Sequence, residues 1–426
     1  MRILWLCNIV PPVVAKQLNT ETSVKEGWIS GILKRISEEE ADITLGICAP
    51  VSDTDGPYRK DNVNIGSLKI CCYRFLEQTA SPWVYDVTLE RTALKIIEDF
   101  KPDMIHSFGS EYPHTLSFAR AWNKPEKFLI GLQGIMRACT EAYCGGLDEK
   151  IVNASTFRDI IKKDNIAAAR DKFAKRAEFE EKAIKLAGHV AGRTEFDKNE
   201  SLKMNPQAKY HYMGETMRSE FYEGSWNEDS LDGHVIFVSQ ADYPLKGFHV
   251  LLEAMPAVLK RFPDAKICVA GNSITNYSTI KEKLKICNYG KYLRSLMEKN
   301  NLLDKVSVLG RLSAEQMKQQ YLRSSVYVCT SFVENSPNSV GEAMLLGTPV
   351  IATETGGIPS LAEKDKEALF VRVGDCKELS DAIIRLFENR ELAISVSKAA
   401  RERARINHDA DKNYNSLMEI YKEICQ

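Results

Sequence analysis

Apolar positions along the chain fall into two recurring patterns, whose alternation predicts an α/β protein. Short β-branched and apolar runs, such as residues 2–7, 43–48 and 326–330, are typical of buried strands. Amphipathic segments between such runs, of which 248–261 is the clearest, predict helices that lay one apolar face on a sheet. Strands that alternate with helices in this way favour parallel, doubly wound sheets.

The pattern occurs twice, so we expect two Rossmann-like domains. The chain has 426 residues, which is more than a single hydrophobic core usually serves. A polar, glycine-containing stretch at 224–233 separates the two sets of strands and helices. We place the first domain at 1–225 and the second at 226–405, and we expect a helix at 406–426 to pack back on the first. Two such domains facing each other would leave a cleft between their strand ends.

The stretch from 330 to 360, TSFVENSPNSVGEAMLLGTPVIATETGGIPS, holds the candidate chemistry. It follows the buried strand at 326–330. Ser336 and Pro337 predict a helix N-cap and first helical position, and Gly347 predicts the helix end. Glu334 therefore lies in the loop before the helix, and Glu342 lies within the helix.

This arrangement suits a ligand with a charged centre and hydroxyl groups at both ends. Backbone amides of Asn338 and Ser339 at the helix start would form an anion site. In α/β folds, ligands bind outside the carboxyl ends of the strands. An anion held there would have one carboxylate on each side, Glu334 and Glu342, and carboxylates accept hydrogen bonds from hydroxyls. A sugar linked to a nucleotide through a diphosphate has this distribution of groups.

Composition excludes several other classes. A formal net charge of −1 argues against general nucleic-acid binding, which needs a basic surface. The 11 cysteines include no C-x-x-C pair, so neither a zinc site nor a thioredoxin motif is indicated, and free thiols in a reducing cytoplasm are expected. The loop after the first strand lacks G-x-G-x-x-G, which disfavours an NAD-dependent enzyme.

Targeting patterns are consistent with a cytoplasmic protein. The N-terminus has no basic segment followed by a long apolar run, and no apolar stretch approaches the length that crosses a bilayer. The charged segment at 150–187 is typical of solvated helix faces. The alternative is peripheral contact with an anionic lipid surface at the inner membrane face, or with a lipid-linked substrate.

The C-terminal half resembles the retaining nucleotide-sugar glycosyltransferases of family 4, which have the GT-B fold. The resemblance rests on Glu334-Asn-Ser-Pro-Asn-Ser-Val-Gly-Glu342-Ala-Met, Gly347-Thr-Pro-Val-Ile-Ala, Gly356-Gly357-Ile-Pro and Pro244-Leu-Lys-Gly-Phe. It covers about residues 234–390, whereas the N-terminal half matches mostly by strand order. The runs Gly-Leu-Gln-Gly and Gly-Arg-Thr-Glu-Phe-Asp resemble bacterial exopolysaccharide- and capsule-type members.

The resemblance implies roles for individual residues. The first glutamate would contact the transferred sugar and the second would bind the ribose, while Lys246 would hold the diphosphate and stabilise the departing charge. No metal and no further cofactor would be required, because this cation and the helix start replace them. The remaining donor-side residues by this resemblance are Asn335, Ser336, Pro337, Asn338, Ser339, Gln240 and, against the base, Arg311 and Leu312. Gly27 is a further candidate because a glycine lets the backbone approach a donor closely, and plain packing is an equal alternative for it.

Two departures from the family pattern concern catalysis. Gln240 stands where relatives usually have an arginine that binds the diphosphate, and Gln133 stands where many have a histidine at a strand end. A neutral amide brings no charge to the first position and takes up no proton at the second. Either the two changes lower activity or they mark a subgroup, and we favour the subgroup.

Acceptor-side residues are defined less sharply. The candidates in the N-terminal half are Gln133, His106, Glu111 and Arg193. A buried, hydrogen-bonded histidine is an equal alternative for His106, as is a structural ion pair for Arg193. We therefore expect a hexosyltransferase that uses a nucleoside-diphosphate sugar and a glycan or lipid-linked acceptor. Two alternatives stay open: a nucleotide-sugar epimerase of GT-B type, and a non-catalytic glycan- or nucleotide-binding subunit. The sequence leaves the oligomeric state open.

Overall fold

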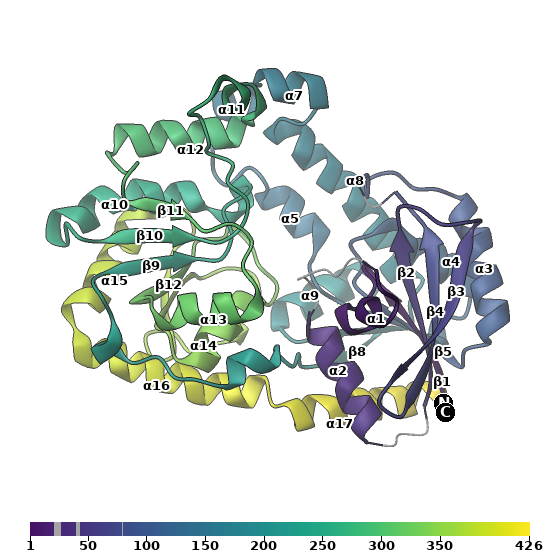
Figure 1. The fold of residues 1–426 in the computed structure, drawn as a ribbon. Coiled ribbons are helices and arrows are strands. Elements are labelled where there is room, and N and C mark those ends of the chain that lie inside the picture. Colours follow the sequence, from purple (N-terminus) through teal and green to yellow (C-terminus); the bar gives the residue numbers. More distant parts are fainter. Residues whose placement is uncertain (21–26, 40–42, 79) are drawn as a thin grey trace. The chain divides into compact units, whose positions relative to one another are not determined.

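The computed structural model describes residues 1–426 except 21–26, 40–42 and 79 (Figure 1). The chain divides into two compact units, and it passes from one unit to the other more than once. The first unit holds Met1–Arg137, Phe173–Arg218 and His408–Gln426, and the second holds Ala138–Lys172 and Ser219–Asn407. Each unit contains one sheet with helices around it (Figure 1).

The first unit is built on an eight-stranded sheet in the order β3-β4-β2-β1-β5-β6-β7-β8. All neighbouring strands pair in parallel except β3 and β4, which are antiparallel. The strands are β1 Arg2–Cys7, β2 Thr44–Val51, β3 Tyr58–Ile65, β4 Leu68–Leu76, β5 Met104–Phe108, β6 Phe128–Gly131, β7 His189–Gly192 and β8 Lys209–Tyr212.

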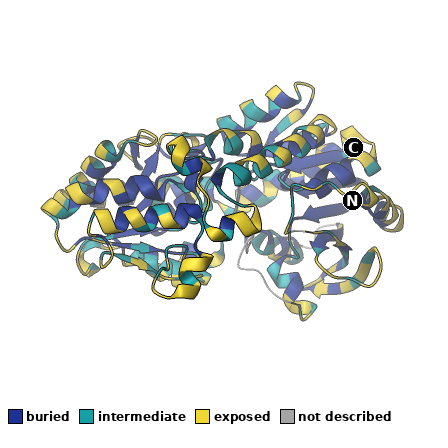
Figure 2. Ribbon diagram, turned by 90° about the horizontal axis from the view of Figure 1, so that it is seen from above, coloured by how far each residue is buried: buried dark blue, intermediate teal, exposed yellow. Residues whose placement is uncertain are grey.

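Helices of the first unit bury apolar faces against this sheet. The C-terminal helix α17 supplies Leu417, Tyr421 and Ile424 to the same core cluster as Ile3 and Trp5 of β1. Buried strands and the exposed outer faces of the helices are distinguished in Figure 2. The α-helices are α1 Pro12–Gln17, α2 Gly27–Glu38, α3 Thr88–Phe100, α4 Pro113–Trp122, α5 Met136–Ala142 (which runs on into the second unit), α8 Ile166–Lys185 (most of it here), α9 Glu195–Met204 and α17 Ala410–Cys425.

The second unit is a six-stranded parallel sheet in the order β11-β10-β9-β12-β13-β14. Counted within the unit, this order is 3-2-1-4-5-6, which is the Rossmann arrangement. The order therefore reverses between β9 and β12. The strands are β9 Val235–Val238, β10 Lys266–Val269, β11 Val306–Val308, β12 Val326–Cys329, β13 Val350–Thr353 and β14 Leu369–Val371.

Residues 138–172 group with the second unit, although the sequence pattern assigned them to the first domain. Their polar groups explain the difference: Thr156 Oγ1 donates to the Ile286 carbonyl over 2.7 Å, and Asp159 accepts from the Asn288 amide over 2.8 Å. A charged helical segment carries no local mark of the sheet that it packs against. The helices of this unit are α6 Glu149–Asn153, α7 Phe157–Lys162, α10 Phe248–Arg261, α11 Ile280–Lys285, α12 Asn288–Lys299, α13 Ala314–Leu322, α14 Asn338–Leu346, α15 Cys376–Glu388 and α16 Arg390–Asn407.

Element boundaries differ from the sequence pattern in a few places. The pattern at 205–223 predicts irregular chain, yet residues 209–212 form the edge strand β8. The helix expected at 406–426 begins at Ala410, because Asp409 caps it by accepting a hydrogen bond from the Lys412 amide. Among the described residues, no helix combines the length and the low polarity that crossing a bilayer demands.

Candidate functional site

The candidate donor site lies where the strand order of the second unit reverses. Strands β9 and β12 are parallel neighbours, so their carboxyl ends meet at one edge of the sheet. The loop after β9 carries Lys246, and the loop after β12 carries Glu334. Ligands of open α/β sheets bind at this kind of reversal. Topology thus brings together two residues that are 88 positions apart.

Lys246 and Glu334 are in direct contact. The Lys246 Nζ lies 2.5 Å from Glu334 Oε1, and Ser331 Oγ donates to the same oxygen over 2.6 Å. The two side chains are only 17% and 15% exposed, so water screens their charges little. Burial disfavours the charged form of Lys246, whereas the charge of Glu334 and its hydrogen bond favour that form. The net effect raises the pKa of Lys246 well above its usual value. Lys246 is therefore a fixed cation at the site.

Glycines allow close backbone contacts between the loops that follow β9, β12 and β13. Gly247 has φ +67°, and a Cβ there would lie 2.0 Å from the Thr330 carbonyl oxygen. Gly356 has φ +54°, and its Cβ would lie 2.0 Å from the carbonyl oxygen of Glu334. That oxygen also accepts a hydrogen bond of 2.9 Å from the Gly357 amide. The Gly356-Gly357 pair therefore positions the backbone of Glu334, a function that its sequence motif does not reveal.

Helix α14 carries the second glutamate. It begins at Asn338, with Pro337 rather than Ser336 in the N-cap position, one residue later than the sequence predicts. The amides of Val340 and Gly341 donate to the Pro337 carbonyl over 3.0 and 3.3 Å, which leaves those of Asn338 and Ser339 at the helix start, where their role as an anion site stays a prediction. Glu342 is buried in this helix at 5% exposure, with its Oε2 3.4 Å from the Tyr321 hydroxyl. That hydroxyl donates to the Ser339 carbonyl over 3.0 Å.

The other donor-side candidates lie on the same edge of the sheet. Asn335 and Ser336 are buried between Glu334 and α14, and Gln240 follows β9. Arg311 and Leu312 follow β11, where Arg311 Nε donates to Asn272 Oδ1 over 3.2 Å. All of these positions come after carboxyl ends of parallel strands. Gly27 is the first residue of α2 in the first unit, and its assignment to the donor stays a prediction.

The first unit has a polar network at its own strand-order reversal, between β1 and β5. Asn8 follows β1, and its Nδ2 donates to Glu111 Oε1 over 2.8 Å. The Oδ1 of Asn8 lies 3.2 Å from Nε2 of His114, whose Nδ1 is 2.7 Å from Glu77 Oε2. Glu111 is thus placed at a position that suits a ligand site, and its role with an acceptor stays a prediction.

The geometry supports the packing alternative for His106. Its side chain is fully buried within β5, and its Nδ1 lies 2.7 Å from the Tyr421 hydroxyl of α17. The ring also packs on Phe108, with 3.9 Å between ring centroids. Burial lowers the pKa of His106 to about 3, so the imidazole is neutral. These contacts make His106 a core residue and remove the basis for its choice as an acceptor residue.

Arg193 forms a buried ion pair, the second of the two alternatives that its sequence context allows. Its Nη2 lies 2.5 Å from Glu215 Oε2, and the two side chains are 5% and 1% exposed. The same nitrogen lies 3.4 Å from Gln133 Oε1. Glu215 therefore balances the charge of Arg193 within the first unit. Gln133 lies just after β6, at the strand end where the sequence places it.

Glu180 is a buried carboxyl that the sequence pattern does not single out, because it lies in a charged helix. It is completely buried in α8, and it accepts hydrogen bonds of 2.7 Å from Ser110 Oγ and from the Met136 amide. Burial raises the pKa of Glu180 to about 7, against the opposing effect of these two donors. Ser110 precedes Glu111, so this carboxyl lies beside the network at the first unit's strand ends.

Known proteins share this architecture. Sucrose-phosphate synthase from Thermosynechococcus elongatus aligns over 100% of this chain and 99% of its own, with a TM-score of 0.68 and 16% identity. Anabaena HepE in complex with UDP-glucose aligns over 99% of both chains, with a TM-score of 0.65 and 14% identity. The chain has the GT-B fold.

Sequence similarity is concentrated in the second unit. Residues 218–403 match the family model described as Glycosyl transferases group 1. Spore coat protein SA of Bacillus subtilis is 26% identical over 193 residues, which are 44% of this chain and 48% of that protein. Phosphatidyl-myo-inositol mannosyltransferase of Mycobacterium leprae is 27% identical over 193 residues, 45% of this chain and 46% of that protein. The matches thus span about half the length of these curated relatives.

The family match separates the two groups of candidate residues. Lys246, Glu334 and Glu342 all lie within 218–403, as do the other donor-side candidates except Gly27. Gln133, Glu111 and Arg193 lie outside it. The part of the chain with glycosyltransferase similarity is therefore the part in which the two glutamates and the lysine are assembled.

Proposed function

We propose that this protein is a retaining glycosyltransferase that moves a hexosyl unit from a nucleoside-diphosphate sugar to a glycan or lipid-linked acceptor. One observation carries the proposal: the contact between Lys246 and Glu334 at the strand-order reversal of the second unit, directly before the start of α14. A fixed cation, a hydroxyl-binding carboxylate and a helix N-terminus are there on one sheet edge. This combination suits a diphosphate between two hydroxyl-bearing groups.

The reaction breaks the bond between the anomeric carbon and the diphosphate oxygen and forms a bond from that carbon to an acceptor oxygen. Negative charge builds on the departing diphosphate, and Lys246 together with the first amides of α14 stabilises it. Attack from the same face gives retention, and the acceptor proton passes to the leaving phosphate. Glu334 orients the transferred sugar through its hydroxyls, and Glu342 binds the ribose.

The donor is a UDP- or GDP-type hexose in this proposal. HepE, whose fold this chain shares, binds UDP-glucose, which supports the uridine alternative. No metal is needed, because Lys246 and the helix start carry the charge that a divalent ion would otherwise neutralise. Gln240 supplies a neutral hydrogen bond to the diphosphate, and the acceptor binds among strand-end residues of the first unit such as Gln133 and Glu111.

Thermal unfolding in the presence of candidate ligands tests the donor assignment. A ligand that binds only the folded protein at 100 times its Kd stabilises it by about 2.7 kcal/mol. UDP, GDP and their hexose conjugates are compared with AMP and with free hexose. The proposal expects a higher Tm with one nucleoside diphosphate family, and the shift should vanish in Lys246→Ala. Equal Tm values with every nucleotide would contradict the donor site.

Product analysis then separates transfer from the two alternatives. The protein is incubated with the donor that raises Tm, with and without a panel of glycan and lipid-linked acceptors, and in the presence or absence of EDTA. Release of nucleoside diphosphate with a new α- or β-linked product of donor configuration supports retaining transfer, at equal rates with EDTA. A sugar epimerised at C2 from donor alone would identify an epimerase. Donor binding without any product across the panel would identify a binding subunit.

A further inference from the structure

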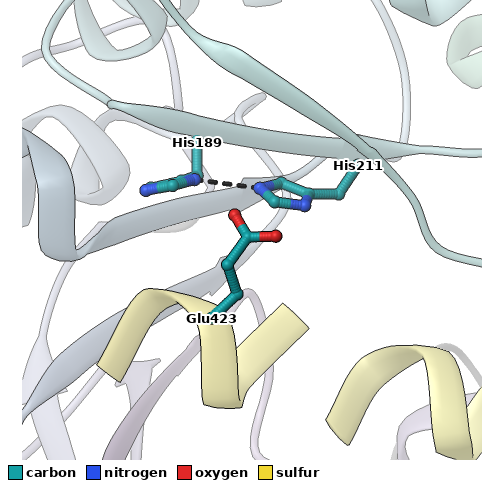
Figure 3. Close-up of side chains that lie close together, drawn as sticks. All are labelled: His189, His211 and Glu423. Atoms are coloured by element: carbon teal, nitrogen blue, oxygen red, sulfur yellow. Dashed lines mark hydrogen bonds between the residues drawn. The ribbon is translucent and has the colours of Figure 1, made fainter. Parts of the chain in front are cut away.

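Two histidines and a glutamate meet at the outer edge of the first unit's sheet. His189 is the first residue of β7, and His211 lies in the neighbouring edge strand β8. The register pairs His189 with Lys209, so His211 is two residues further along and on the same face. Glu423 reaches this face from α17, as Figure 3 shows. One potential ligand atom from each of the three lies within 4.8 Å of the others.

Backbone contacts determine which nitrogen of His189 is available. Its Nε2 lies 3.2 Å from the carbonyl oxygen of Glu126, which accepts hydrogen bonds but does not donate them. The proton of the neutral ring is therefore on Nε2, and Nδ1 carries a lone pair. That lone pair lies 2.9 Å from Nε2 of His211 (Figure 3). A carbonyl that orients the outer nitrogen of a histidine in this way is the usual partner of metal-binding imidazoles.

Both rings are available as neutral ligands. A metal ion takes the place of the single proton between the two nitrogens if His211 moves its proton to Nδ1. This tautomer change releases no net proton, so binding costs no deprotonation at neutral pH.

Two neighbouring lysines affect how strongly Glu423, the third potential ligand, would bind a metal ion. Lys209 Nζ lies 2.6 Å from Glu423 Oε1, which leaves the other carboxylate oxygen to a metal. Lys127 donates from its ammonium group to the Ile424 carbonyl beside Glu423. These two cations weaken binding of a divalent ion, whereas Glu423, whose pKa is lowered chiefly by its hydrogen bond to Lys209, stays ionised.

We propose that His189, His211 and Glu423 bind a Zn²⁺ ion that fastens the C-terminal helix α17 to the sheet edge. Two imidazoles and one carboxylate are an established zinc ligand set, and the exposed side of Glu423 leaves a fourth position to water. Nitrogen ligands at about 2.0–2.1 Å in tetrahedral geometry are about 3.3 Å apart, so the two rings separate by about 0.4 Å on binding. The site is independent of the proposed glycosyl transfer.

Calorimetry with ZnCl₂ on the full chain tests the site. The protein is first stripped with EDTA and dialysed, and the wild type is compared with His189→Gln, Glu423→Gln and the control His234→Gln. His234 is a partly exposed histidine of the second unit, paired with Asp264 over 2.8 Å. The 11 cysteines are the same in every variant, so a difference in zinc binding between variants comes from the substituted residue. We expect one binding event that weakens at least ~10-fold in the first two variants and is unchanged in the control.

Hydrogen exchange of residues 410–425 gives a second measurement. Zn²⁺ should slow amide exchange in α17 of the wild type and of His234→Gln, and should leave the rate unchanged in Glu423→Gln. Glu423 is exposed, so this variant is expected to fold even if His189→Gln does not. Equal zinc affinity and equal exchange in the wild type, Glu423→Gln and His234→Gln would overturn the proposal.

Discussion

Replacing Lys246 by methionine tests the candidate site most directly. Methionine keeps an unbranched side chain of similar length and removes the charge. The variant leaves the carboxylate of Glu334 without its cation in a place where that side chain is 15% exposed. Two different losses follow, one in folding stability and one in donor turnover, and they have separate physical origins.

The magnitudes follow from the geometry of the pair. The 2.5 Å contact is mostly removed from water, so loss of one partner leaves a poorly solvated charge, which costs about 3–5 kcal/mol in fully buried pairs and less here. Loss of a charged contact to the departing diphosphate costs about 2–5 kcal/mol in the transition state. The lower end of the second range is a factor of about 30 in rate and its midpoint a factor of about 400, so we expect donor turnover to fall by about 400-fold and by no less than ~30-fold.

The double variant Lys246→Met/Glu334→Gln separates the two effects. With both charges gone, no carboxylate is left uncompensated, so the free energy of unfolding in urea should recover most of its loss. Donor turnover should not recover, since the cation for the diphosphate is still missing. The control Lys377→Met removes a lysine from a surface pair with Asp381 in which the side chains are 83% and 59% exposed. It should change neither the unfolding free energy by more than about 0.5 kcal/mol nor the turnover.

The assay measures release of nucleoside diphosphate and, by calorimetry, its affinity. If Lys246→Met keeps turnover within tenfold of the wild type, Lys246 does not stabilise the leaving group and the site assignment fails. If the double variant recovers turnover together with stability, the pair is a structural ion pair and nothing more. Both outcomes are distinguishable from simple unfolding, because the stability of each variant is measured on the same preparation.

Three further predictions concern single positions. Glu342→Ala should lower donor turnover at least ~10²-fold through loss of ribose contacts, with the loss visible as weaker nucleotide binding in calorimetry, and unchanged binding would contradict its role. Gly356→Ala places a Cβ 2.0 Å from the Glu334 carbonyl at φ +54°, so it should lower both Tm and turnover, and a wild-type Tm would show that the loop tolerates the shift. His106 has a pKa of about 3 in the folded chain and about 6.5 in the unfolded chain. As pH falls from about 6.5 toward 3, the unfolded chain binds this proton and the folded chain does not, so the free energy of unfolding falls by about 1.4 kcal/mol per pH unit. Urea unfolding at pH 6 and pH 4 should show a smaller loss in His106→Phe than in the wild type, and equal losses would mean that His106 is already charged in the fold.

Local pattern was sufficient for most strands and for the helix that carries Glu342. Buried strands can be recognised from continuous apolar runs. The sequence predicts the start of α14 to within one residue, because the proline and the glycine at its two ends limit the backbone there. Strands without that signal are not predicted by local pattern. Lys209–Tyr212 has two polar or charged residues in four, because β8 is a half-exposed edge strand, and it is this strand that carries His211.

Residue type along the chain determined which groups are available for chemistry, whereas the tertiary structure decided which of them meet. The sequence alone identifies a lysine and two glutamates in a pattern that resembles a nucleotide-sugar site. The contact of Lys246 with Glu334 exists because β9 and β12 are neighbours in the sheet, and the pairing of strands far apart in sequence depends on long-range packing that no local window contains. For the same reason the sequence left His106 undecided, and the burial of its ring against Tyr421, 315 positions away, decided for the core.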